Sequence, residues 1–240
     1  MMKVWLYFFL FLLAHALNAT EFRLLPIAID LNNRDQLQRG AILFMNYCSG
    51  CHSLHYLRYN RMLTDLGFIT QGNHSPSLID KIMLTPEQRN NSIETSVLAD
   101  EASRWFGASP PDLSLSARQR GPSWLYTYLK SFYIDRKRPF GSNNLLLVNV
   151  AMPNVLAPLQ GQVINTHHLD EHNGLMTLES GELSEKEFDS VVRDLITFLV
   201  YVAEPARFVR QQIAMTVLIF LTILVWVTYK LKQDYWRDIG

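Results

Sequence analysis

The feature that most constrains this 240-residue chain is a short segment with the order Cys48, Ser49, Gly50, Cys51, His52. The spacing C-x-x-C-H attaches a c-type haem covalently, with both thiols bonded to the haem and the imidazole beside its iron. These are the only two cysteines, so no thiol remains for a structural disulfide and a four-cysteine zinc site is excluded. A thioredoxin-like dithiol is the alternative, but it does not explain the adjacent histidine. The motif therefore predicts one covalent haem c, with His52 as an axial ligand.

The N-terminus has the layout of a secretory signal peptide. Lys3 precedes an uninterrupted apolar run over residues 4–14, and small residues follow at Ala16 and Ala19. We expect residues 1–19 to be the signal, with cleavage after Ala16 or Ala19, and an uncleaved N-terminal anchor is the alternative. Export would place the mature chain in the periplasm, where covalent haem attachment is expected.

The C-terminal region contains a second apolar run. It has no charged residue from Ile213 to Tyr229, and it reaches Leu231 if the side chain of Lys230 snorkels. About 19 residues at 1.5 Å each span about 28 Å, close to the hydrocarbon thickness of a bilayer. We therefore predict a transmembrane anchor over residues 206–231 and a cytoplasmic tail over 232–240. A buried core helix is the alternative, but nothing else in the chain is large enough to enclose it.

The residues between these segments, 20–205, are enough for one domain. Lysine plus arginine and aspartate plus glutamate balance at 22 each, which gives no support for a nucleic-acid-binding surface. Phosphate-loop and dinucleotide-binding fingerprints are missing from the sequence, so a nucleotide cofactor has no support either. The predicted order is signal, single haem domain and membrane anchor.

Three segments of the domain have apolar residues at helical spacing. Residues 36–47 lead directly into the haem motif, and residues 123–132 form a second candidate helix. The third begins at an S-x-x-E capping box made by Ser184 and Glu187 and ends near Glu204. Strand signals are weak, so a mainly α fold is expected.

Two long stretches, residues 60–122 and 139–178, are rich in Pro, Gly, Ser and Asn. Such long irregular segments are unusual in a compact domain and need something to fold around. We expect them to be irregular loops packed on the apolar surface of the haem.

The second axial position of the iron decides which kind of protein this is. A methionine there gives an electron-transferring iron of raised potential, whereas an open position favours binding or activating small ligands. Four methionines are candidates, namely Met62, Met83, Met152 and Met176. Met152 stands out because Pro153 restricts it to an extended conformation, although a gap-filling core methionine remains the alternative.

Several segments resemble the cytochrome c1 family, and the resemblance spans nearly the whole mature chain. These segments are Tyr47 to Ser53, Leu57 to Tyr59, Trp105 to Gly107, Pro110 to Ser114, Ala117 to Gly121, Trp124 to Leu129, Met152 to Leu156 and Leu159 to Gly161. The resemblance implies a cytochrome c-like haem domain with long irregular loops, plus one C-terminal transmembrane helix. It also implies that Met152 is the second axial ligand, and that Arg120 stabilises a haem propionate or tunes the potential. A solvated surface arginine is the alternative for Arg120.

The function implied by the resemblance is that of the haem subunit of the cytochrome bc1 complex, the quinol to cytochrome c reductase. Such a subunit is an electron carrier and not an enzyme on its own. Its expected partners are cytochrome b and the Rieske iron-sulfur protein, with cytochrome c as acceptor. Its expected location is the bacterial inner membrane, with the haem domain in the periplasm. The alternative is a membrane-anchored c-type haem enzyme or sensor with an open sixth ligand site.

Three polar groups outside the haem motif complete the sequence predictions. The pair Asn143 and Asn144 matches the family pattern, with turn formation as its one assigned role. A histidine cluster could bind a metal, although a polar loop is the better explanation of it. A set of acidic residues could steer a basic cytochrome c. The histidines are His167, His168 and His172, and the acidic residues are Asp170, Glu171, Glu179 and Glu182.

Overall fold

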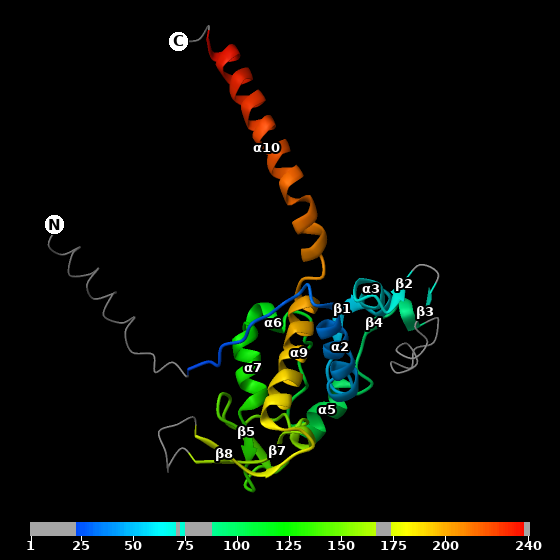
Figure 1. The fold of residues 1–240 in the computed structure, drawn as a ribbon, viewed down its shortest axis with the longest axis vertical. Coiled ribbons are helices and arrows are strands. Elements are labelled where there is room, and N and C mark those ends of the chain that lie inside the picture. The colour runs from blue at the N-terminus through cyan, green and yellow to red at the C-terminus, as the bar shows by residue number, and fades with distance from the viewer. Residues whose placement is uncertain (1–22, 71–72, 75–87, 167–173, 238–240) are drawn as a thin grey trace, which may run out of the picture.

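The computed structural model describes residues 23–70, 73–74, 88–166 and 174–237. About half of these residues are helical, and one long helix extends away from the rest (Figure 1). Several predictions lie outside the described residues: the signal peptide over 1–19 with its cleavage sites at Ala16 and Ala19, Met83, the three histidines of the cluster, and the acidic residues Asp170 and Glu171.

Two helices that lie side by side form the centre of the domain (Figure 1). Helix α2 (Arg34–Tyr47) begins at Asn33, whose side chain accepts a hydrogen bond from the backbone N–H of Gln36. Helix α9 (Glu185–Ala203) begins at Ser184 with the predicted capping box. Each cap satisfies backbone donors that have no partner within the helix. Both helices are confirmed close to their predicted bounds.

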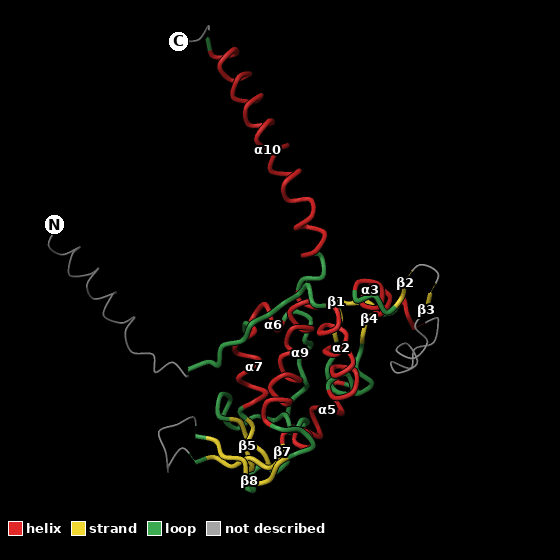
Figure 2. The backbone as a smooth tube through the Cα atoms, viewed as in Figure 1, coloured by secondary structure: helices red, strands yellow, loops and turns green. Residues whose placement is uncertain are grey.

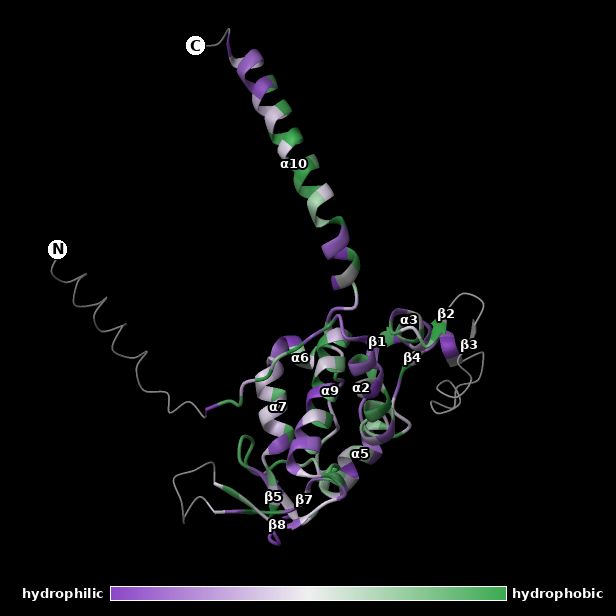
Figure 3. Ribbon diagram, viewed as in Figure 1, coloured by the Kyte–Doolittle hydropathy of each residue, from purple (hydrophilic) through white to green (hydrophobic). Residues whose placement is uncertain are grey.

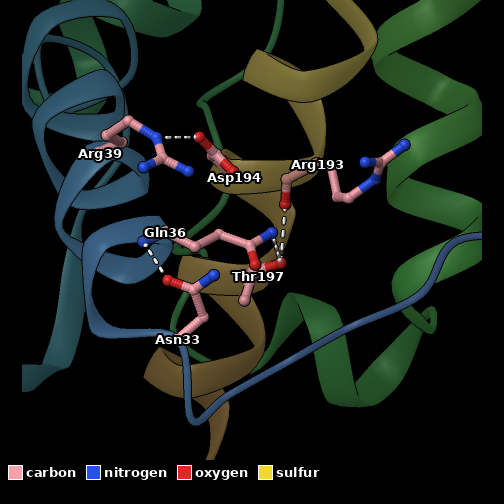
Figure 4. Close-up of polar contacts among 6 residues, drawn as sticks. All are labelled: Asn33, Gln36, Arg39, Arg193, Asp194 and Thr197. Atoms are coloured by element: carbon pink, nitrogen blue, oxygen red, sulfur yellow. Dashed lines mark hydrogen bonds and ion pairs between the residues drawn. The ribbon is translucent and has the colours of Figure 1, made fainter.

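A glycine allows these helices to approach closely. A Cβ at Gly40 would overlap the carbonyl oxygen of Asp194 and lie 2.7 Å from the Cβ of Phe198. Beside this contact, Gln36 Nε2 donates to Thr197 Oγ1 at 3.1 Å, and Arg39 pairs with the buried Asp194 carboxylate at 2.6 Å (Figure 4). These polar contacts fix the register of α2 against α9, and the register determines where the C-terminal end of α2 lies.

The main core lies around the α2 and α9 contact. Phe44 and Phe198 are fully buried, with ring centroids 5.8 Å apart. Buried residues of neighbouring segments complete the cluster, among them Leu57, Met62 and Leu125. Because Met62 is fully buried among apolar side chains, the structure places it in the core.

The remaining helices are short. The predicted helix over 123–132 is present as α7, shifted toward the N-terminus because Pro122 occupies its first turn and Phe132 belongs to a strand. Helix α7 spans Pro122–Lys130, and the other short elements are α3 (Tyr59–Asp65), α5 (Ala99–Phe106), α6 (Ser116–Gln119), α8 (Ala157–Gln160) and the 3-10 turn η2 (Gln88–Asn90).

Four two-stranded antiparallel pairs are present among the described residues, several of them at the end far from the long helix (Figure 2). The two stretches expected to be irregular are therefore irregular only in part. Short helices and strands occur in both, since such short elements leave little periodicity in a sequence. The pairs are β1 (Leu54–Arg58) with β4 (Ser92–Ile93), β2 (Ile69–Thr70) with β3 (Asn73–His74), β5 (Phe132–Ile134) with β6 (Ser142–Asn144), and β7 (Gly161–Asn165) with β8 (Leu175–Ser180).

Helix α10 (Arg207–Trp236) is the long helix that leaves the domain. Its central part is apolar (Figure 3), and the stretch Val209–Trp236 is long and apolar enough to cross a membrane, with none of it buried in the structure. The helix extends past Leu231, where the predicted anchor ends. A polar cluster marks its start, where Glu204 pairs with Arg210 and lies 3.9 Å from Arg118.

Candidate functional site

The haem motif forms one helical turn at the end of α2. The backbone N–H groups of Cys48 and Ser49 donate to the Phe44 carbonyl at 2.8 and 2.9 Å. Those of Cys51 and His52 then donate to the Cys48 carbonyl at 3.0 and 2.8 Å. This proximal turn, residues 48–52, therefore brings both thiols and the imidazole together through hydrogen bonds within a few residues of the motif.

The imidazole of His52 has one nitrogen engaged and one available. Its Nδ1 lies 2.8 Å from the carbonyl oxygen of Pro111. A carbonyl can only accept, so Nδ1 carries the proton and the lone pair is on Nε2. Desolvation by burial lowers the pKa of His52, which favours the neutral form that binds metals. The Nε2 atom of His52 could therefore bind a metal.

The pKa of the Cys48 thiol does not fit dithiol redox chemistry. Burial, with a smaller contribution from Cys51, raises the pKa of the Cys48 thiol to about 12. Redox-active C-x-x-C motifs depend on a lowered cysteine pKa. Both cysteines are unpaired in the structure. The raised pKa therefore disagrees with the thioredoxin-like alternative.

A loop from elsewhere in the chain holds the proximal turn from outside. Thr95 Oγ1 donates to the Gly50 carbonyl at 2.7 Å, and the Thr95 N–H donates to Ser53 Oγ at 3.0 Å. The Leu113 N–H donates to the Ser53 carbonyl at 2.9 Å. This last bond fixes the segment that contains Pro111, whose carbonyl contacts His52.

Met152 lies at the end of a loop, residues 145–152, which we call the distal loop. The loop follows β6 and is organised by two buried asparagines. Asn144 Oδ1 accepts the N–H groups of Leu146 and Leu147 at 2.9 and 3.1 Å, and Asn143 Oδ1 accepts that of Asn149 at 2.9 Å. The pair therefore shapes the loop that presents Met152, a role that turn formation alone did not predict.

Arg138 supports the same loop from its outer side. Asn149 adopts the left-handed conformation with φ of 62°, which costs free energy for a residue with a side chain. Arg138 Nη2 donates to the Asn149 carbonyl at 2.9 Å and to the Val150 carbonyl at 3.4 Å. These bonds help to stabilise the unusual backbone directly before Met152.

A column of side chains on α7 ends at Met152. The guanidinium of Arg120 lies 5.1 Å from the ring centroid of Trp124, and that ring stacks on Tyr128 at 5.2 Å and 7°. The Tyr128 hydroxyl donates to Met152 Sδ at 3.3 Å. Arg120 is exposed at the far end of this column, so it connects to Met152 through two aromatic rings.

The structure distinguishes the described methionine candidates by their surroundings. Met62 is fully buried in the core, and Met176 is 49% exposed on β8. Met152 is partly buried on a hydrogen-bonded loop, with a polar partner on its sulfur. Of the three, Met152 has the surroundings that a ligand requires.

These groups fit the donor set of a c-type haem. Two unpaired thiols and an imidazole nitrogen lie on one turn, and a thioether sulfur is held on a separate loop. Among the described residues, no group of three or more His, Cys, Asp or Glu side chains is placed to hold a metal ion directly.

Residues 28–239 match the model of the Cytochrome C1 family. The chain belongs to the cytochrome c1 family. Cytochrome c1 of Allochromatium vinosum is 44% identical over 218 residues, which cover 88% of this chain and 87% of that protein. These two findings confirm the resemblance seen in the motifs.

Two further relatives have other names. A Nitrosomonas europaea protein named ammonia monooxygenase gamma subunit is 39% identical and covers 94% of this chain and 92% of its own length. The cytochrome b/c1 of Bradyrhizobium diazoefficiens is 23% identical over 86% of this chain, which matches 34% of that longer protein.

Cytochrome c1 is the haem-bearing electron-transfer subunit of the bc1 complex and carries one covalently bound haem c. The chain is thus a membrane-anchored electron carrier and not an enzyme on its own, as the resemblance implied.

Sequence reasoning missed several residues of the site. Pro111 and Tyr128 were noted only as parts of motifs, and Arg138 was not noted at all. Tyr128 had a detectable signal, because Trp124 and Tyr128 are four residues apart on one helix and therefore lie on the same face of it. Pro111 contacts His52 through its own backbone carbonyl, and Arg138 donates to backbone carbonyls of the distal loop. Contacts that involve backbone carbonyl groups leave no sequence pattern.

Proposed function

We propose that Cys48 and Cys51 form the two thioethers to haem c and that His52 and Met152 are its axial ligands. The observation that carries this proposal is the tautomer of His52: Nδ1 donates to the Pro111 carbonyl, so Nε2 is left for the iron. Met152 supports it, because its sulfur lies on a loop fixed by buried asparagines.

The bound haem supplies a one-electron couple at its iron. In the proposed site, His52 and Met152 would hold the iron in both oxidation states, so little rearrangement would accompany electron transfer. Cys48 and Cys51 hold the group in register without contacting the iron. Arg120 remains our candidate for tuning the potential through its fixed charge, acting along the column from Trp124 to Tyr128.

The partners are proposed from the family and from one relative. Electrons would arrive from the Rieske iron-sulfur protein and leave to a cytochrome c, with cytochrome b as the membrane neighbour. The Bradyrhizobium relative combines b and c1 in its name, which supports the last of these. Glu179 and Glu182 are exposed near β8 and remain candidates for steering a basic acceptor.

We also propose that residues 1–19 are a cleaved signal and that residues 20–205 are periplasmic. Residues 206–231 would cross the bacterial inner membrane, with residues 232–240 as the cytoplasmic tail. The export signal supports this orientation, because arginines and lysines flank the apolar helix on both sides.

A redox-titrated optical spectrum with carbon monoxide addition tests the ligand set. We expect the wild-type chain to be low-spin and not to bind carbon monoxide, whereas Met152→Ala becomes high-spin and binds it. Met176→Ala is the matched control, since that methionine is exposed on β8, and it should behave as the wild type. A wild type that binds carbon monoxide readily would instead favour an enzyme or sensor with an open sixth site.

A further inference from the structure

We propose that Tyr128 is a positioning residue for the axial methionine: its hydroxyl donates to Met152 Sδ in the assembled site and raises the reduction potential of the haem. The inference rests on the proposed role of Met152 as ligand. It starts from the 3.3 Å contact between the Tyr128 hydroxyl and Met152 Sδ.

The chemistry of a thioether permits both interactions at once. The sulfur has two lone pairs and is a weak hydrogen-bond acceptor. One lone pair accepts the proton of Tyr128, which is a phenol and therefore protonated at neutral pH. The second is left for the iron, so the hydrogen bond restricts the rotation of Met152 and orients the free lone pair.

The ring of Tyr128 is held firmly enough to do this. It stacks on Trp124 at 5.2 Å and meets Phe132 edge-on at 5.2 Å and 70°. Its own carbonyl accepts a hydrogen bond from Asn144 Nδ2 at 2.7 Å. Tyr128 and Asn144 are both buried. The residue that supports the ring thus also organises the distal loop, which links the donor and the acceptor through one buried side chain.

The effect on the potential follows from charge. A hydrogen bond withdraws electron density from the Met152 sulfur. The sulfur then donates less electron density to the iron and stabilises ferric iron less than it would without the hydrogen bond. Ferrous iron depends less on that donation, so the reduced state gains relative to the oxidised state. This is tuning of the iron by a hydrogen bond to its ligand.

The test is the midpoint potential of the full-length, haem-loaded Tyr128→Phe chain in detergent. We expect a lower potential, by about a threefold shift in the reduction equilibrium, which equals about 28 mV for one electron. Tyr126→Phe is the matched control, because Tyr126 is a buried tyrosine on the same helix that packs against Lys130. Its potential should stay at the wild-type value.

A second variant moves the potential in the opposite direction. A fluorinated tyrosine at position 128 is a stronger donor than tyrosine, so it should raise the potential above that of the wild type. An unchanged potential in both position-128 variants, with methionine ligation intact, would overturn the inference alone. Failure of the proposed ligand set gives a different result, in which the wild type itself binds carbon monoxide.

Discussion

The two sides of the haem site are built differently. The proximal turn is one helical turn at the end of α2, and its four backbone hydrogen bonds reach no farther than from Phe44 to His52. The distal loop is held by side chains of Asn143, Asn144, Arg138 and Tyr128, which act on backbone or sulfur atoms several to many residues away.

This difference shows which part of the site depends on the fold. The backbone hydrogen bonds of the proximal turn are local and form wherever α2 forms, while Thr95 and Pro111 contact the turn from elsewhere in the chain. The distal loop depends on a network of buried polar groups, in which losing one member leaves its partners unsatisfied. We therefore expect mutations in the distal network to release Met152 while the proximal attachment remains.

The largest expected effect is a loss of stability at the close contact between α2 and α9. Gly40→Ala places a methyl group against the carbonyl of Asp194, and overpacking at this crossing should lower the free energy of unfolding by about 3 kcal/mol. Denaturant unfolding of the full-length chain measures this. Gly50→Ala is the control, since no atom lies within 4 Å of its Cβ position and its effect should be small. Equal losses from both variants would contradict the close approach.

A variant with a smaller expected effect tests whether the distal loop and the proximal turn are independent. Asn144→Ala removes the acceptor of the Leu146 and Leu147 N–H groups and the donor to the Tyr128 carbonyl. We expect a loss of about 2 kcal/mol in unfolding free energy and partial binding of carbon monoxide. Covalent haem, measured by mass spectrometry, should be unchanged. Asn60→Ala, at an exposed asparagine on α3, should affect neither. Loss of covalent haem in Asn144→Ala would show that the two sides are not independent.

The smallest expected effect is the dependence of methionine ligation on pH. The hydrogen bond from Asn143 to Asp135, with the Lys137 N–H as a second donor, lowers the pKa of Asp135 below 3.8. A lowered carboxyl pKa stabilises the fold above the unfolded pKa, and this contribution is lost as the pH falls through the folded value. Methionine ligation in the wild type should therefore weaken by a small amount as the pH falls through this range.

Asp135→Asn tests that dependence, because its side chain does not ionise. Its loss of methionine ligation on acidification, followed by optical spectra, should be less steep than in the wild type. Identical acid profiles in the wild type and Asp135→Asn would show that Asp135 does not stabilise the distal loop.

Much of the architecture was predictable because its signals are local. Asn33 and Ser184 mark helix starts, and α10 is apolar over a bilayer's length. The short strands and α5 were not predicted, since elements of so few residues leave little pattern in a sequence. Within the site, Cys48, Cys51 and His52 follow from spacing alone. The role of Asn144 required the structure, because one of its partners, the Tyr128 carbonyl, lies 16 residues away in the sequence.

The most direct test of the account is the environment of the methionine methyl groups in the reduced, full-length chain. With methyl-labelled methionine, the account predicts one methyl resonance shifted far upfield by the haem ring current and lost in Met152→Leu. It also predicts that the resonance persists in Met62→Leu and Met176→Leu. Absence of such a resonance in the wild type, or its loss in a variant other than Met152→Leu, would contradict ligation of the iron by Met152.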